Sequence, residues 1–400
     1  MIVGDTHICT IETLAYGGDG IARIDGRVVF VPETVPGETV SVGITQMKKT
    51  FARGKVVEVV TPSPDRISPC CRIGDSARVP GCVYDHLDYA AEVSAKQNQL
   101  EGFFRRIPHD ADAFLPPVAS PAPLHYRNKI TLHAAGAYLG YRQEPEHRVL
   151  DIPACPLADS AINDALRLFR ETDGMQHWLD DGDDLVLRVT QHDGALWWTS
   201  QGVCSPDCPD LLTEQSPAGA LKVPRDGFYQ VNPTVGDALV RFVADAFAAD
   251  TGTPDILDLY CGVGVFGLAC AKQGGRKLTG IESGSAAVAA ARQNAKALGV
   301  DGRFMVHMLG REPLRLNDWM KAPSETTIIV DPPREGMDKS TVQALAASAA
   351  ARIFYVSCDP ATLARDLTIL LADGKHRVRR IRLFDMFPRT AHFETVVEMC

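Results

Sequence analysis

Two residues toward the carboxyl end of the sequence have the chemistry of a nucleophile and a general base. Cys358 follows the apolar run 355–357 and precedes a helical segment, which predicts a strand-to-helix junction. Isolated cysteines are usually buried fillers, but a helix start lowers the pKa of a nearby thiol and so favours a nucleophile here. Glu394 and His392 alternate with apolar residues, which predicts that both lie on one strand face. Such a face, taken alone, is equally typical of a solvated strand.

A glycine-rich loop earlier in the chain is typical of a nucleotide-cofactor site. Gly262, Gly264 and Gly267 follow the pattern G-x-G-x-x-G between an apolar run and a helical one. Glu282 closes the next apolar run, close to the spacing of about 20 residues expected for a ribose-binding carboxylate. S-adenosylmethionine, NAD and a purely structural turn all remain open. Asp258, just before the loop, favours S-adenosylmethionine because a carboxylate there would repel a pyrophosphate and suits a cationic amino group.

A rigid acidic corner follows another apolar run. Asp331 is followed by two prolines and Arg334. The prolines prevent a helical continuation and hold the carboxylate at the carboxyl edge of the predicted sheet. Amino-group methyltransferases have an aromatic residue after such a corner, which stacks on a flipped base. Arg334 in that place disfavours their chemistry.

Strand and helix patterns alternate from residue 226 onward and would position all of these residues. This alternation predicts an α/β, Rossmann-like fold with a parallel sheet between helices and a ligand crevice at the carboxyl ends of the strands. The expected strands cover residues 255–260, 277–282, 326–330, 352–356, 378–383 and 393–398. The expected helices cover residues 233–249, 266–273, 285–298, 340–350 and 360–372.

Two further parts precede this domain. Residues 1–62 contain short apolar runs separated by glycine turns, which predicts a small β-barrel. Its last hairpin carries basic residues within 48–55, either as a solvated edge or as a phosphate contact. Residues 63–225 predict a mixed α+β central domain, with one helix over residues 84–106 and another near residues 160–169. We expect the first helix to pack on the domain that follows.

Composition limits the class of protein. The chain has 400 residues, 45% of them hydrophobic, and a formal net charge of −9. These values fit several globular domains and exclude a uniformly basic nucleic-acid coat, although not a local basic face. The sequence has neither a secretory signal nor a membrane span. We therefore expect a cytoplasmic protein whose eleven cysteines are reduced and serve as fillers, metal ligands or catalysts.

Three segments of the sequence resemble the signatures of the RNA uracil-5 methyltransferase family. They are residues 331–336, 355–359 and 385–394, and residues 228–232 resemble a further family motif. Their order and spacing agree with the family over residues 226–400. The resemblance implies a class I S-adenosylmethionine-dependent methyltransferase that modifies C5 of uridine in RNA.

The resemblance also implies roles for individual residues. Cys358 would add to C6 of the target uracil, and Glu394 would remove the C5 proton. The target uridine would have to be flipped out of its stack. Arg389 departs from the family, which usually has Gln, His, Tyr or Thr there, and we expect it to alter substrate contacts. The cofactor contacts would be Gln230, Tyr260, Gly262, Gly264, Glu282 and Asp331.

Family members often hold an iron–sulfur cluster with four cysteines, and this chain has only part of that pattern. The matching candidates are Cys70, Cys71, Cys82 and Cys155. The middle ligand of the family motif falls at Val79, which cannot bind iron. The hypotheses are a [4Fe–4S] cluster held by these four thiolates, a zinc ion, or no metal. Cys204 and Cys208 are expected to be structural.

The N-terminal barrel resembles the TRAM domain that precedes many of these enzymes, which implies RNA as the partner. Candidate RNA contacts are the basic residues within 48–55 and 377–382. We favour 23S ribosomal RNA over transfer RNA uridine 54 and expect a monomer with no membrane partner. The alternatives are cytosine-C5 methylation, a non-catalytic RNA-binding or ribosome-assembly factor, and an NAD oxidoreductase. Cytosine-C5 methylation is disfavoured by the Pro-Pro-Arg corner. A non-catalytic factor is disfavoured by the presence of Cys358 and Glu394, and an NAD oxidoreductase is disfavoured by Asp258.

Overall fold

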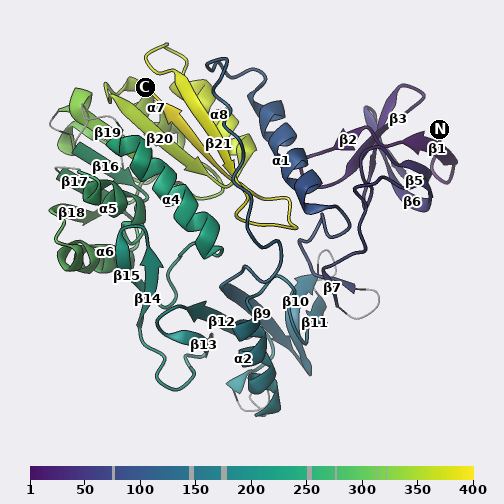
Figure 1. Ribbon diagram of the computed structural model, residues 1–400, viewed down its shortest axis with the longest axis horizontal. Helices are drawn as coiled ribbons and strands as arrows, with labels where there is room; N and C mark the ends of the chain where they lie inside the picture. The colour runs from purple at the N-terminus through teal and green to yellow at the C-terminus, as the bar shows by residue number, and fades with distance from the viewer. Residues whose placement is uncertain are drawn as a thin grey trace.

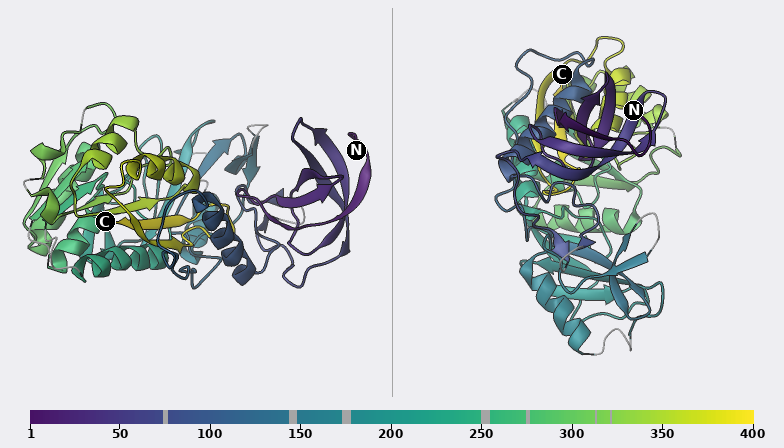
Figure 2. Two further views of the ribbon diagram at one scale, coloured as in Figure 1. Left: turned by 90° about the horizontal axis from the view of Figure 1, so that it is seen from above. Right: turned by 90° about the vertical axis from the view of Figure 1, so that its right-hand side faces the viewer.

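The computed structural model describes residues 1–73, 77–143, 148–172, 178–249, 255–274, 277–312, 314–320 and 322–400. Three parts are visible: a small N-terminal barrel, a central part around an antiparallel sheet, and a larger sheet flanked by helices (Figure 1). The barrel projects at one end of an elongated molecule, far from the carboxyl terminus (Figure 2). No helix in these ranges is both long and apolar enough to span a lipid bilayer.

The barrel is a six-stranded sheet with the order β1-β5-β6-β4-β3-β2, in which β1 also contacts β3. Alternate residues of β5 point inward, and Val29, Val40 and Val42 are fully buried. This period of two produces one apolar face that closes around the core. The predicted small β-barrel is confirmed. Its strands are β1 (Thr6–Thr10), β2 (Thr13–Leu14), β3 (Gly20–Ile24), β4 (Arg27–Val31), β5 (Thr39–Met47) and β6 (Phe51–Thr61).

A connecting segment joins the barrel to helix α1 (Tyr89–Phe104) and contains the short pair β7 (Arg72–Ile73) and β8 (Ala77–Arg78). The helix begins later than the sequence suggested, because Asp88 is the N-cap and its carboxylate accepts hydrogen bonds from the first-turn amides. Leu100 and Phe104 are fully buried in the same core as residues of the large sheet. Helix α1 therefore lies between the barrel and the catalytic part (Figure 1).

The central part has a five-stranded antiparallel sheet with the order β11-β10-β9-β12-β13. Helix α2 (Ser160–Glu171) packs on it through Ile162, Leu166 and Phe169. A separate hairpin, β14 (Leu211–Ser216) and β15 (Gly219–Pro224), was not expected from the sequence and packs on α6 (Ser285–Leu298). The sheet strands are β9 (Lys129–Ala135), β10 (Tyr138–Gln143), β11 (Arg148–Asp151), β12 (Asp184–Thr190) and β13 (Gly194–Thr199).

The large sheet has seven strands in the order β18-β17-β16-β19-β20-β22-β21. The strands from β18 to β20 are parallel, as predicted, but β22 is antiparallel to both of its neighbours. The expectation of a wholly parallel sheet was wrong there, because β21 and β22 are joined by a direct return loop, without a crossover helix. The strands are β16 (Asp255–Leu259), β17 (Lys277–Glu282), β18 (Gly302–Val306), β19 (Thr326–Val330), β20 (Arg352–Ser357), β21 (Val378–Phe384) and β22 (Glu394–Met399).

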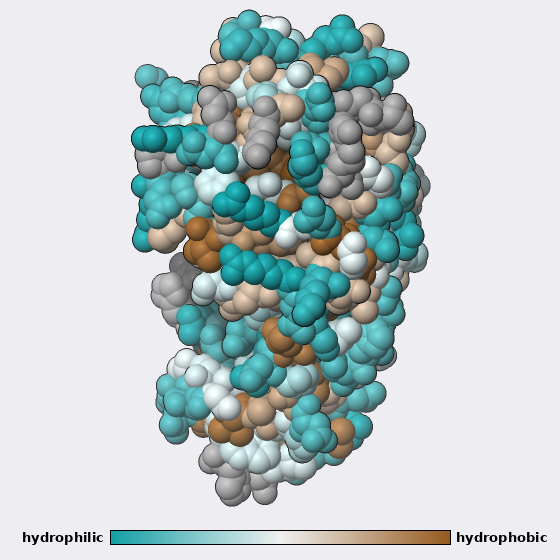
Figure 3. Space-filling model, turned by 90° about the vertical axis from the view of Figure 1, so that its left-hand side faces the viewer, coloured by the Kyte–Doolittle hydropathy of each residue, from teal (hydrophilic) through white to brown (hydrophobic). Residues whose placement is uncertain are grey.

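Helices cover both faces of this sheet. Helices α4, α5 and α6 share one apolar core with it, whereas α7, α8 and α1 share the other. Toward the β18 edge, the surface is largely hydrophilic with small separate apolar groups (Figure 3). The helices are α4 (Pro233–Ala248), α5 (Val265–Lys272), α6 (Ser285–Leu298), α7 (Lys339–Ala347) and α8 (Pro360–Leu370), with short 3-10 turns at Leu316–Asp318 and Pro323–Glu325. Together with the parallel strands, these layers confirm the predicted α/β fold.

Candidate active site

The strand register brings three of the predicted cofactor residues to neighbouring positions. Leu259 of β16 pairs with Ile281 of β17 on one side and with Val330 of β19 on the other. The next residues, Tyr260, Glu282 and Asp331, therefore lie at the carboxyl ends of three adjacent parallel strands. This is the edge at which open α/β sheets bind their ligands.

The glycine loop is tied to the end of β17 through Glu282. One carboxylate oxygen of Glu282 accepts a hydrogen bond from the amide of Gly262 at 3.1 Å, and the other accepts from the amide of Gly284 at 2.8 Å. Gly262 and Gly264 have φ angles of 53° and 88°, which few other residues adopt. Glu282 is half-buried, so its carboxylate is fixed beside the loop and still reachable by a ribose.

Asp258 has a different role from the one suggested by the sequence. Its side chain is fully buried, and one oxygen accepts a hydrogen bond from the amide of Gly267 at 2.9 Å. Burial raises its pKa to about 8, against the effect of that hydrogen bond. Asp258 therefore fixes the first turn of α5 from within, and its charge does not face the loop surface. The predicted selection of the cofactor by this charge was wrong.

Tyr260 and Gln230 complete the predicted cofactor set. Tyr260 has a φ of 59°, in the left-handed region, and burial raises the pKa of its hydroxyl to about 12. Gln230 is buried just before α4, and its backbone oxygen accepts a hydrogen bond from the side-chain amide of Asn128 at 3.2 Å. The neighbouring Val231 lines a cavity at the active site. The cofactor contacts of both side chains stay predictions.

The corner after β19 is held by helix α8. The carbonyl of Arg334 accepts a hydrogen bond from Thr362 at 3.2 Å, and the amide of Met337 donates to Asp366 at 2.9 Å. Asp366 also accepts a hydrogen bond from Tyr355 of β20 at 2.6 Å. These contacts fix the backbone after Asp331, which leaves its carboxyl group and the exposed Arg334 at the sheet edge.

Cys358 and Glu394 are neighbours across two antiparallel strands. Ser357, the last residue of β20, pairs with Thr395 of β22, so the next pair in that register is Cys358 and Glu394. Cys358 is half-buried, whereas Glu394 is buried and has one carboxylate oxygen without a hydrogen-bond partner in the described part of the chain. A buried, unsatisfied carboxylate beside a thiol is typical of a functional site.

The electrostatics of the pair differ from the expectation for Cys358. Burial raises the pKa of its thiol to about 12, and the nearby Glu394 adds to the shift, although Arg334 lowers it. Asp359 is the N-cap of α8 and accepts hydrogen bonds from two of its amides at 2.9 Å. The helix start therefore does not lower this pKa overall, because burial outweighs it. Burial and then repulsion from Asp331 raise the pKa of Glu394 to about 8.

His392 does not share a strand face with Glu394, because β22 begins only at Glu394. It lies in the preceding loop with its ring edge-on to Phe387, at a centroid distance of 6.4 Å. Both residues line a cavity of about 400 Å³, together with Arg334 and Thr390. The prediction of a common strand face for His392 and Glu394 was wrong.

The same cavity contains residues that no motif in the sequence marks. Lys129, the first residue of β9, and Arg127 just before that strand line it together with Arg334. Burial, followed by repulsion from Arg188 and Arg127, lowers the pKa of Lys129. Cations from separate parts of the chain therefore line one cavity, and one of them, Arg334, also acts on the pKa of Cys358. A fixed cationic group of this kind suits an anionic polymer.

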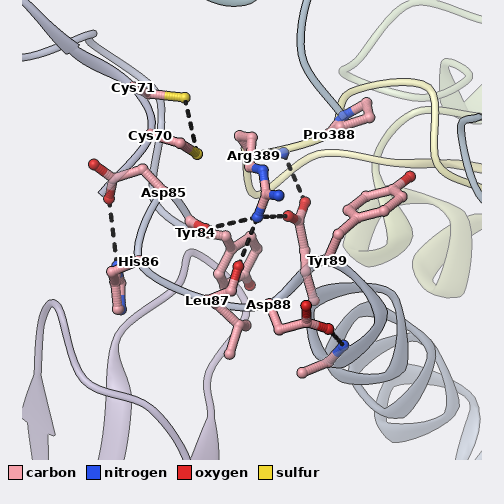
Figure 4. Close-up of polar contacts among 12 residues, drawn as sticks. Cys70, Cys71, Tyr84, Asp85, His86, Leu87, Asp88, Tyr89, Pro388 and Arg389 are labelled. Atoms are coloured by element: carbon pink, nitrogen blue, oxygen red, sulfur yellow. Dashed lines mark hydrogen bonds and ion pairs between the residues drawn. The ribbon is translucent and has the colours of Figure 1, made fainter. Parts of the chain in front are cut away.

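Arg389 faces away from this cavity. Its guanidinium donates hydrogen bonds to the carbonyls of Leu87 at 2.6 Å and Tyr84 at 3.4 Å and forms an ion pair with Glu92 at 3.3 Å (Figure 4). Only 4% of the residue is exposed. The expectation that Arg389 alters substrate contacts was wrong. Its side chain instead holds the loop between β21 and β22 against α1 and against the residues just before α1.

The four candidate metal ligands all belong to one buried cluster in the central part. The sulfur atoms of Cys70 and Cys71 are 4.0 Å apart (Figure 4), and Tyr141 donates a hydrogen bond to Cys155 at 3.3 Å. Across the described ranges, no three His, Cys, Asp or Glu side chains are arranged to hold a metal ion. The Cys71 thiol contacts both Cys70 and Cys82, and the binding of a four-thiolate cluster by these residues together with Cys155 stays a prediction.

The two basic segments differ in their contacts. Arg377 forms an ion pair with Asp110 at 3.1 Å but its side chain stays 69% exposed, and Arg380 forms an ion pair with the buried Glu398 at 2.5 Å. In the barrel, Lys48, Lys49 and Lys55 are exposed. Arg53 is also exposed, although it forms an ion pair with Asp19 at 2.9 Å. The barrel segment is therefore the more available basic surface.

Comparisons with known proteins agree with this geometry. Residues 218–399 match the family model described as tRNA (Uracil-5-)-methyltransferase, and residues 3–57 match the TRAM domain. An uncharacterized RNA methyltransferase of Thermosynechococcus vestitus is 32% identical over 98% of this chain and 97% of its own length. The 23S rRNA (uracil(1939)-C(5))-methyltransferase RlmD of Acidithiobacillus ferrooxidans is 31% identical over 96% of this chain and 95% of its own.

A solved structure agrees over nearly the whole chain. The tRNA (uracil-54, C5)-methyltransferase of Pyrococcus abyssi, in complex with S-adenosyl-L-homocysteine, has a TM-score of 0.73 and 26% identity, covering 98% of this chain and 99% of its own. The chain therefore belongs to the RNA uracil-5 methyltransferase family and is an S-adenosylmethionine-dependent enzyme with an N-terminal TRAM domain. The predicted family, fold class and methyl donor are confirmed.

Proposed function

We propose that this enzyme methylates C5 of a uridine in 23S ribosomal RNA through a covalent bond between Cys358 and C6 of the uracil. The observation that supports this proposal most is the pairing of Cys358 with Glu394 at the ends of β20 and β22. It supplies a nucleophile and a base next to each other, at the same sheet edge as Glu282 and Asp331.

The chemistry explains why both groups are needed. C5 of uracil is a weak nucleophile, and addition of the Cys358 thiolate to C6 converts the ring into an enolate. When bound, S-adenosylmethionine would supply its methyl group to C5 and would leave as the neutral thioether S-adenosylhomocysteine. Glu394 removes the C5 proton, the C5–C6 double bond re-forms, and the thiolate leaves. Atoms and charge balance, since the uracil proton replaced by the methyl group is transferred to the carboxylate.

The residues at the sheet edge fit the methyl donor. The fixed, half-buried carboxylate of Glu282 offers two acceptors to a ribose diol. Burial raises the pKa of Asp331 to about 7, and Asp331 also raises the pKa of Glu394. A site whose carboxyl groups resist ionisation in this way is stabilised by a bound cation, and the donor carries a sulfonium and an ammonium.

We further propose that the cations of the cavity, Arg127, Lys129 and Arg334, bind the RNA backbone around the flipped uridine. The exposed lysines of the barrel would add a second contact with the RNA. We propose three domains, with bounds at residues 1–62, 63–225 and 226–400. The choice of 23S rRNA is supported by relatives that align along nearly the whole chain and carry this substrate in their names. Transfer RNA is the alternative, supported by the solved neighbour.

Trapping with 5-fluorouridine RNA tests the covalent step, because fluorine cannot leave C5 as a proton does. The wild-type enzyme should form an adduct stable to denaturation, and Cys358→Ala should form none. Glu394→Gln should accumulate an adduct with ordinary RNA, since the C5 proton is not removed. A control at the half-buried Cys400, Cys400→Ala, should behave as wild type. A Cys358→Ala protein that still forms the adduct would contradict the assignment.

Mass spectrometry of ribosomal and transfer RNA tests the substrate. A deletion strain should lack one methyluridine in 23S rRNA and keep the one in transfer RNA. Loss of the transfer RNA methyluridine alone would instead establish the alternative substrate.

The iron–sulfur cluster stays a separate prediction from the family resemblance, and no step above depends on it. Iron and sulfide analysis of anaerobically purified protein tests it: about four irons per chain would support the cluster, and iron-free, colourless protein would refute it.

A further inference from the structure

The N-terminal barrel sends one aromatic side chain toward the candidate nucleophile. Tyr16 lies in the turn between β2 and β3, closed by a hydrogen bond from the amide of Ala15 to the carbonyl of Asp19 at 2.8 Å. Gln99 of α1 donates to the carbonyl of Ala15 at 3.0 Å. The turn is packed so closely that a Cβ at Gly18 would lie 2.7 Å from the Val83 side chain. The position of Tyr16 is therefore fixed by α1 and the segment before it.

The ring of Tyr16 is held between two other aromatic rings. It meets Phe393 edge-on at a centroid distance of 6.1 Å and Phe103 of α1 edge-on at 5.5 Å. Phe393 directly precedes the general base Glu394 in the chain. Such edge-to-face contacts restrict the ring to one orientation, so the barrel, α1 and the catalytic loop meet at this side chain.

The hydroxyl group of Tyr16 has no visible structural purpose. Its oxygen is buried and lacks a hydrogen-bond partner within the described residues. Burial raises its pKa, the neighbouring Asp359 and Cys358 raise it further, and Arg334 lowers it. Because Asp359, Cys358 and Arg334 all act on this pKa, the hydroxyl lies within electrostatic range of the nucleophile, and the raised pKa keeps it protonated as a donor. Leaving such a group unsatisfied costs about 1–3 kcal/mol in general.

We infer that Tyr16 is a substrate-contacting residue of the active site, supplied by the RNA-binding barrel, and that its hydroxyl donates a hydrogen bond to the target nucleotide beside Cys358. This inference rests on the proposed function. A flipped uridine presents carbonyl and ribose oxygens, all of which accept hydrogen bonds. The barrel would thereby take part in aligning the base for attack, in addition to holding the RNA.

Tyr16→Phe tests this inference, because it removes only the hydroxyl and keeps the ring against Phe393 and Phe103. The readout is the single-turnover rate of adduct formation with 5-fluorouridine RNA at saturating RNA. We expect this rate to fall about 10-fold or more, with little change in RNA affinity. The melting temperature of the free protein should stay equal or rise, since an unsatisfied buried group is removed. Tyr138→Phe, at an exposed tyrosine of β10, is the matched control.

Two results would overturn the inference. Tyr16→Phe could form the adduct at the wild-type rate, or it could lose rate only in proportion to a lowered melting temperature, as a packing role would require. Failure of the proposed function is distinguishable, because then the wild-type enzyme itself would form no adduct through Cys358.

Discussion

Replacing Lys96 by methionine should destabilise the protein strongly, because Lys96 is a buried cation between two buried carboxylates. Its ammonium group donates hydrogen bonds to Glu92 at 2.7 Å, to Asp385 at 2.7 Å and to the carbonyl of Phe387 at 3.2 Å. Lys96, Glu92 and Asp385 are all fully buried. Arg389 supplies the second cation, so the four side chains are balanced in charge.

The size of the loss follows from the charge that remains. Removing one partner from a buried ionic group generally costs about 3–5 kcal/mol, because an uncompensated charge stays inside the protein. Burial already raises the pKa of Glu92 to about 7, so this carboxyl can take up a proton near neutral pH at little cost. We therefore expect a loss near the lower end, about 3 kcal/mol in the free energy of unfolding at pH 7.

Urea denaturation followed by circular dichroism measures this loss. The exposed Lys296 of α6 offers a matched control, and Lys296→Met should change stability by no more than about 0.5 kcal/mol. The double variant Lys96→Met with Asp385→Asn restores charge balance and should regain part of the loss. A loss of less than about 1 kcal/mol in Lys96→Met would refute this explanation, as would a double variant no more stable than the single one.

Three further predictions concern the catalytic part. The rate of adduct breakdown should rise about tenfold per pH unit up to about pH 8 and then level off. The reason is that Glu394 must be ionised to remove the proton, and burial raises its pKa to about 8. Quench-flow kinetics from pH 6 to 9 measures this rate, and a flat profile would contradict the prediction. Gly267→Ala should lower the free energy of unfolding, measured by urea denaturation, by about 1–3 kcal/mol, because a Cβ there would lie 2.5 Å from the Leu278 side chain. Gly102→Ala in α1 is the control, since a Cβ there meets no atom within 4 Å and should not destabilise the protein. Asp359→Ala should lose about 1 kcal/mol by the same assay because α8 loses its N-cap, and an unchanged midpoint would argue against that cap.

The sequence by itself determined most of the catalytic domain. Continuous apolar runs such as 326–330 predict buried parallel strands, and the bounds of β17, β19 and α6 coincide with those expected. The strands and helices of this part can be predicted because the spacing of apolar residues differs between strands and helices, and because local residues mark where each element ends. The motifs around Cys358 and Glu394 also indicate the family, because their residue types and spacing are properties of the chain alone.

Only the tertiary structure decided how the candidate site is assembled. The antiparallel position of β22, which brings Glu394 next to Cys358, depends on pairing between distant segments, and no local signal in the sequence reports it. The burial of Asp258, which removes its charge from the loop surface, and the raised pKa of Cys358 depend on packing in the same way.

The parts contributed by other domains were likewise hidden from the sequence. Arg127 and Lys129 reach the cavity from the central sheet, and the ring of Tyr16 in the barrel contacts Phe393, the residue before Glu394. In the sequence, Arg389 stands out only because the family usually has other residues there. In the structure it is a buried cation that links the loop between β21 and β22 to α1. Local propensity describes how a segment folds, whereas burial and charge balance arise only when distant segments share one interior.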